Sequence, residues 1–109
     1  MDSQDLQCEV EKTEEVAAGR VATVTCHGPL VAGTTDVLKA TVKPLIADGG
    51  KIIVDVGDVQ YIDSMGLGAL VGLKISAIGA GYCTLQYENL SKKLQELISI
   101  THLTDLLKS

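Results

Sequence analysis

The feature that most constrains the fold is a short run of β-branched residues in the middle of the chain, from Ile52 to Val56. Such a run predicts a strand that lies inside a sheet and is covered on both faces. A strand pattern over 20–27 and a helical pattern over 34–47 precede it. Because a strand, a helix and a buried strand in succession are typical of a βαβ unit, the chain should form an α/β fold.

The rest of the chain supplies further elements around this unit. Alternating apolar and polar residues predict an edge strand over 6–12, and helical spacing predicts a helix over 64–80. A short strand over 82–87, a helix beginning near Leu90 and a helical fragment over 103–107 follow. The predicted architecture is one α/β sandwich with a mixed four- to five-stranded sheet and about four helices.

Two features disturb the predicted helices. Pro44 lies inside the helix over 34–47 and removes the hydrogen bond to the Ala40 carbonyl, which predicts a kink or a break into two pieces. Gly66, Gly68 and Gly72 lower the helix propensity of the segment over 64–80. The glycines indicate either that something packs closely against this helix or that its first turn is functional.

Size and charge limit the possible functions. A chain of 109 residues is the size of one domain, and we expect it to be a single unit with its core over about 6–107. The net charge of −5 disfavours direct binding of nucleic acid. The N-terminus lacks the pattern of a signal peptide, and the apolar run 65–73 is too short to span a bilayer. We therefore expect a cytoplasmic protein without membrane contact.

The residues that could ligate a metal or catalyse a reaction form no recognisable motif. Cys8, Cys26 and Cys83 contain no C-x-x-C pair, so we expect reduced thiols rather than a disulfide framework or a zinc site. His27 and His102 show no triad spacing to Ser64. We therefore predict no enzymatic activity, no catalytic residue, no metal and no cofactor.

Three aspartates allow one alternative site. Asp55, Asp58 and Asp63 could surround a Mg²⁺ ion at the strand ends. We disfavour this alternative, because Asp55 lies within an apolar strand and is better suited to bonding a loop, while Asp58 is better suited to capping a turn.

One segment carries a recognisable motif, V-D-V-x-x-V-x-Y-I-D-S-x-G-L, over residues 54–67. It resembles the signature of STAS domains, especially of bacterial anti-sigma factor antagonists, in which a buried strand leads to a D-S-x-G-L turn that opens a helix. The resemblance continues through 79–81 and 93–97, and covers about 21–107.

The resemblance implies a partner-switching function. In that family the serine of the D-S pair, here Ser64, is phosphorylated by an anti-sigma factor that is an ATP-dependent serine kinase. The unphosphorylated antagonist sequesters this kinase and frees a sigma factor, and a phosphatase reverses the phosphorylation. The implied protein is a monomer or weak homodimer. The implied partner-binding residues are Asp63, Ser64, Met65, Gly66 and Leu67.

Physical chemistry makes Ser64 a plausible site of phosphorylation. If Ser64 is the N-cap of the helix over 64–80, a phosphate there meets free backbone N–H groups at the positive end of the helix. The phosphate adds about −1.5 to −2 charges beside Asp63, which should repel a partner surface shaped for neutral serine. The simpler alternative is that Ser64 only caps the helix and Asp63 only forms a turn.

The chain departs from the family pattern after the second predicted strand. Phosphorylatable members often carry an acidic residue and then Asp after the glycine that ends this strand, whereas here Gly28 is followed by Pro29, Leu30 and Val31. This departure leaves a second function open. The chain could be a non-phosphorylated structural STAS subunit of a stressosome-like signalling complex or of a lipid-transport complex.

Overall fold

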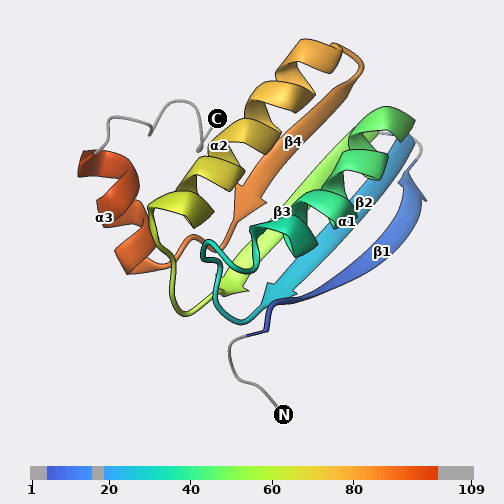
Figure 1. The fold of residues 1–109 in the computed structure, drawn as a ribbon. Helices are drawn as coiled ribbons and strands as arrows, with labels where there is room; N and C mark the ends of the chain where they lie inside the picture. The colour runs from blue at the N-terminus through green and yellow to red at the C-terminus, as the bar shows by residue number, and fades with distance from the viewer. Residues whose placement is uncertain (1–4, 16–18, 101–109) are drawn as a thin grey trace.

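The computed structural model describes residues 5–15 and 19–100. The described residues form seven elements, shown in Figure 1. In chain order these are β1 (Gln7–Glu15), β2 (Gly19–His27), α1 (Thr35–Asp48), β3 (Gly50–Asp58), α2 (Ser64–Ala80), β4 (Cys83–Glu88) and α3 (Lys92–Ile100). The fragment predicted over 103–107 lies outside the described residues.

The sheet is mixed, as predicted, and its four strands run in the order β1-β2-β3-β4. β1 pairs antiparallel with β2, while β2–β3 and β3–β4 are parallel pairs. The parallel pairs require crossover connections, which α1 and α2 supply. The predicted βαβ unit is thus confirmed, and β1 forms an edge.

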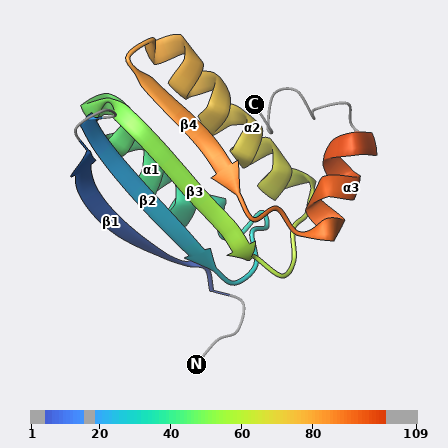
Figure 2. The same cartoon turned by 180° about the vertical axis from the view of Figure 1, so that it is seen from behind.

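Both crossover helices lie on the same face of the sheet, whereas the other face carries no helix among the described residues (Figures 1 and 2). The prediction that 52–56 is covered on both faces is therefore wrong. Ile52, Val54 and Val56 are buried under the helices, but Ile53 and Asp55 point to the open face and are half-buried. On the open face, the neighbouring strands β2 and β4 cover these side chains only in part. An unbroken apolar run therefore does not require a helix on both faces of the sheet.

The core between the helices and the sheet is almost entirely aliphatic. The Tyr87 hydroxyl lies in this core and donates a hydrogen bond of 2.7 Å to the Leu70 carbonyl, and burial raises its pKa. The Lys74 ammonium donates to the Leu85 carbonyl, and its pKa is lowered by desolvation. The largest fully buried side chains are Leu30, Leu38, Ile52, Leu70, Leu73, Leu85, Leu94, Ile98, Val24, Val42 and Val54.

Pro44 does not divide α1, which continues as one helix to Asp48. Of the predicted kink or break, the break is therefore wrong. Leu45 and Ile46 follow the proline and are both buried, so the packing of the last turn offsets the backbone hydrogen bond that Pro44 cannot make. The helix ends at Gly49, which has a φ of 81° and donates its N–H to the carbonyls of Leu45 and Ile46.

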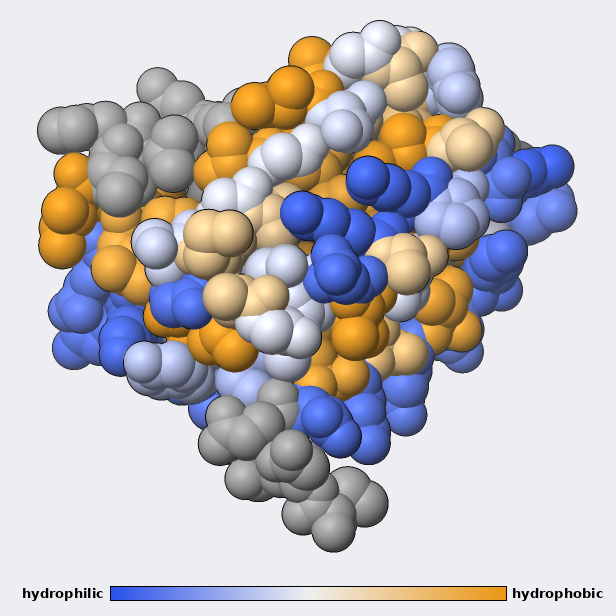
Figure 3. All heavy atoms as spheres, viewed as in Figure 1, coloured by the Kyte–Doolittle hydropathy of each residue, from blue (hydrophilic) through white to orange (hydrophobic). Residues whose placement is uncertain are grey.

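The outward surfaces of the two crossover helices differ. Figure 3 shows hydrophobic and nearly neutral side chains along α2, and strongly hydrophilic ones gathered beside it over α1. Ile75 and Ile78 of α2 are 56% and 61% exposed. No helix among the described residues combines the length and the apolar character that crossing a membrane requires.

Candidate functional site

The predicted site lies where the loops after β2 and β3 meet at the first turn of α2. The two loops are joined by backbone contacts: Leu30 forms a parallel bridge with Ile62, and the Leu30 N–H donates to the Tyr61 carbonyl at 2.9 Å. The Gly28 N–H donates to the Asp58 carbonyl at 3.2 Å. Because both strands are parallel, their carboxyl ends lie at the same edge of the sheet and hold the two loops as one unit.

Asp63 is the residue that caps α2. Its Oδ1 accepts the Gly66 N–H at 2.8 Å, and its Oδ2 accepts the Ala32 N–H from the other loop at 3.2 Å. These backbone donors, Gly66 foremost, lower the pKa of Asp63. The prediction that Ser64 is the N-cap is therefore wrong by one residue. The Asp63 carboxylate accepts the backbone N–H that an N-cap side chain binds, and Ser64 is the first residue of the helix.

The five predicted partner-binding residues divide into two groups. Ser64 and Met65 face solvent, and Met65 is 59% exposed. The Ser64 side chain makes no hydrogen bond to any residue in the described part of the chain. Gly66 and Leu67 are buried and support the turn from within, while Asp63 is half-buried. The turn thus presents a serine hydroxyl and a methionine side chain on a rigid base.

Tyr61 and Lys93 extend the exposed surface toward α3. Tyr61 is 56% exposed, and the Lys93 ammonium lies 5.2 Å from the centroid of its ring, within the range of a cation–π contact. This pair could not be predicted from the sequence, because the two residues belong to segments far apart along the chain. Together with Met65, they give the surface around Ser64 both apolar area and a positive charge.

The aspartates considered as a Mg²⁺ pocket have separate partners. Asp55 accepts the Gly57 N–H and the Asn89 side-chain amide, each at 2.9 Å, so it bonds a loop as predicted. Asp58 pairs with His27, and Asp63 caps α2. Within 5–15 and 19–100, no group of three His, Cys, Asp or Glu side chains is placed to hold a metal ion.

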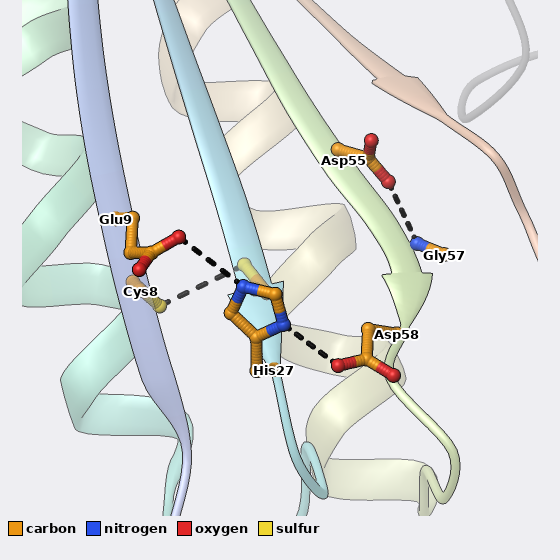
Figure 4. A network of polar contacts seen from close by, with 7 residues as sticks. Cys8, Glu9, His27, Asp55, Gly57 and Asp58 are labelled. Atoms are coloured by element: carbon orange, nitrogen blue, oxygen red, sulfur yellow. Dashed lines mark hydrogen bonds and ion pairs between the residues drawn. The ribbon is translucent and has the colours of Figure 1, made fainter.

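His27 lies between two carboxylates on the open face of the sheet, as Figure 4 shows. Its Nδ1 is 2.7 Å from Oδ2 of Asp58, and its Nε2 is 3.3 Å from Oε1 of Glu9. Only an imidazolium can donate from both nitrogens, and these contacts, with Asp58 first, raise the pKa of His27. Sequence reasoning missed this network, because its residues come from three strands that only the sheet register brings together.

The His27 network makes stability depend on pH. Because the pKa of His27 is higher in the folded protein, its contribution is fully present below the unfolded value of about 6.5 and is lost as pH rises through the folded value. We expect the thermal midpoint of the wild type to exceed that of His27→Gln most at about pH 6 and least at about pH 9. His102 is common to both proteins and cancels in the difference. A difference that does not change with pH would contradict the ion-pair assignment.

Comparison with known proteins identifies the family and the fold. The STAS domain family matches residues 8–108 of the chain. The anti-sigma-B factor antagonist of Bacillus subtilis (strain 168) is 39% identical over 83 residues, which span 71% of this chain and 74% of that protein.

Two solved structures share the fold. SpoIIAA of Bacillus in its phosphorylated form superposes with a TM-score of 0.68 at 17% identity, covering 93% of this chain and 88% of that one. The murine anion transporter Slc26a9 matches with a TM-score of 0.73 at 17% identity, but this chain covers only 19% of the transporter. At these identities the structures show the fold alone, whereas the match over 8–108 shows the family. This chain belongs to the STAS domain family.

Proposed function

We propose that this protein is an anti-sigma factor antagonist whose state is set by phosphorylation of Ser64. In this proposal the unphosphorylated protein binds an anti-sigma factor with serine kinase activity in the cytoplasm and frees a sigma factor. A phosphatase removes the phosphate from Ser64. The protein acts by binding and catalyses no reaction itself. The similarity to the Bacillus subtilis antagonist supports the role, and the exposed Ser64 at the first turn of α2 is the observation that carries it.

The capping arrangement leaves Ser64 available for modification. Because Asp63 satisfies the first turn of α2, the hydroxyl of Ser64 is not needed as a cap and can be phosphorylated without opening the helix. An exposed phosphate at this position also lies near the positive end of the helix, which favours a negative charge. We therefore infer that phosphorylation leaves the domain folded.

Phosphorylation should instead weaken the binding of the partner. The Asp63 carboxylate is already ionised beside Ser64, so a phosphate of about −1.5 to −2 charges concentrates negative charge on one small surface. A partner that fits the neutral serine, Met65 and Tyr61 would have to accommodate this charge without water. The surface should thus bind the partner when Ser64 is unphosphorylated and release it when Ser64 carries phosphate.

Two substitutions at Ser64 test the proposal. Ser64→Ala removes no cap, so we expect its free energy of unfolding to stay within about 0.5 kcal/mol of wild type and its affinity for the kinase to be retained. Ser64→Asp should also fold, but its charge should weaken kinase binding by about tenfold or more. Titration calorimetry with candidate anti-sigma factor kinases from the same genome measures the affinities.

Ser76→Asp is the matched control for the added charge. Ser76 is exposed on the same helix and lies about 18 Å along the axis from Ser64, at about 1.5 Å per residue. It should bind the kinase as wild type does. If Ser64→Asp binds as tightly as wild type while Ser64→Ala loses binding, the serine contacts its partner in another way and the switch proposal fails.

A second candidate function rests on the loop after β2. Pro29, Leu30 and Val31 replace acidic residues that phosphorylatable family members often carry, and the structure places this loop against Asp63 through the Ala32 N–H. This observation favours a structural STAS subunit that is never phosphorylated. Incubation with ATP and each candidate kinase separates the two functions: phosphate on Ser64 supports the switch, whereas stable binding without phosphorylation supports the structural subunit.

A further inference from the structure

Two cysteines face each other on the adjacent strands β1 and β2. Cys8 and Cys26 are directly opposed in the antiparallel pairing, and their sulfur atoms are 3.7 Å apart in an S–H···S contact. Both are free thiols in this structure. Cys83, on β4, contacts the Ala77 carbonyl instead, at 3.7 Å.

The backbone geometry at this pair is suitable for a covalent bond. Directly opposed residues of an antiparallel pair have Cα atoms about 4.5 to 5.5 Å apart, which lies within the range of about 4.4 to 6.8 Å that disulfides span. The sulfurs of Cys8 and Cys26 already point toward each other, so only side-chain rotation is required to bring them to bonding distance. The strands need not separate.

The two thiols differ in a way that assigns them different chemical roles. Cys8 is partly exposed, whereas Cys26 is only 1% exposed. The contact with Cys26 and the nearby His27 lower the pKa of Cys8, while the contact with Cys8 and burial raise the pKa of Cys26. Because the accessible thiolate is the nucleophile, Cys8 is the group that reacts with an oxidant and Cys26 is the group that resolves the product.

We propose that Cys8 and Cys26 are a modification site, at which a peroxide oxidises the protein to an intramolecular disulfide. In the first step the Cys8 sulfur attacks a peroxide oxygen and the O–O bond breaks. This step gives a sulfenic acid on Cys8 and, with hydrogen peroxide, one water. In the second step the Cys26 sulfur attacks the Cys8 sulfur, and the S–O bond breaks. The Cys26 proton leaves with the hydroxide as a second water, so the two thiols lose two electrons and the peroxide gains them.

The disulfide would fix the start of β1 to the end of β2, next to His27. Gly28, two residues after Cys26, begins the loop that contacts Asp63. A bond between Cys8 and Cys26 closes the segment 8–26 and restricts the unfolded chain. We therefore expect oxidation to raise the thermal midpoint by on the order of 10 °C. This inference is independent of the proposed function, since it requires no partner and no phosphate.

The experiment uses the full chain with hydrogen peroxide as the probe, followed by alkylation of the remaining thiols and mapping of peptides without reduction. Before alkylation we expect the intact mass to fall by about 2 Da, because the disulfide forms with loss of two hydrogens. After alkylation we expect the peptides containing Cys8 and Cys26 to be linked and Cys83 to be alkylated. Cys83→Ser should form the same disulfide and show the same rise in thermal midpoint, which reduction with dithiothreitol reverses. Cys26→Ser should instead stop at a sulfenic acid on Cys8, which dimedone traps.

Three results would overturn the proposal. One is that Cys8 and Cys26 are both alkylated after peroxide treatment. Another is a disulfide that includes Cys83 or joins two chains. The third is that Cys26 is oxidised as fast in Cys8→Ser as in wild type, which would show that Cys8 is not the reacting thiol. Because the wild type and Cys83→Ser give the first two readouts, the test of disulfide formation does not depend on the folding of the variants at 8 and 26.

Discussion

Replacing Gly66 by alanine should lower the free energy of unfolding by about 3 kcal/mol or more. A Cβ atom at this position would lie 2.0 Å from the Leu30 carbonyl oxygen and 2.9 Å from Cγ1 of Ile62. The Leu30 carbonyl cannot simply withdraw, because it accepts the Asp63 N–H and its residue bridges to Ile62. The first turn of α2 would therefore have to move away from the loop that supports it.

Gly68→Ala is the matched control, two residues further along the same helix. Nothing lies within 4 Å of a Cβ built at Gly68, and the residue is exposed. Alanine there should stabilise the protein by about 0.5 to 1 kcal/mol, since glycine costs that much in a helix. Urea denaturation of both variants measures the difference. Equal effects in the two variants would show that the approach of α2 to Leu30 does not limit residue 66.

The comparison of these glycines shows what helical spacing can and cannot predict. The sequence places Gly66, Gly68 and Gly72 on one helix and indicates close packing or a functional first turn. The structure assigns close packing to Gly66 alone, while Gly68 and Gly72 face open space. The spacing of apolar residues tells which side of a helix is buried, but not which backbone approaches it. The contact that restricts Gly66 comes from Leu30, which lies in a different loop.

The fold was largely predictable, because its pattern is local. The strand patterns over 6–12, 20–27, 52–56 and 82–87 and the helical spacing over three segments predict the four strands and three helices that the structure describes. Coverage of the sheet was not predictable in the same way. Ile53 is apolar although it lies on the open face, so the run of residues has the composition of a strand buried on both sides. Whether one or both faces of the strand are covered depends on the side on which α1 and α2 cross the sheet.

The site was predictable where it is continuous in the chain. Asp63 and Ser64 follow a strand and begin a helix, and the structure places them as the motif requires, with the cap one residue earlier than predicted. The second bond of Asp63, to the Ala32 N–H, and the contact between Lys93 and Tyr61 could not be predicted. Each joins segments that are brought together by parallel pairing or by the packing of α3.

Leu38→Ala should lower the free energy of unfolding by about 2 to 5 kcal/mol, because the side chain is 0% exposed and its loss leaves a cavity between α1 and the sheet.

Val37→Ala is the matched control. Val37 is the neighbouring residue and has a similar place in the apolar pattern of the sequence, yet it is 41% exposed. Its loss of buried area is small, and alanine's higher helix propensity offsets part of it, so the change should stay within about 0.5 kcal/mol. Urea denaturation with unchanged m-values would attribute both results to the native state. A cost at residue 37 equal to that at residue 38 would mean that α1 is rotated about its axis relative to the orientation described above.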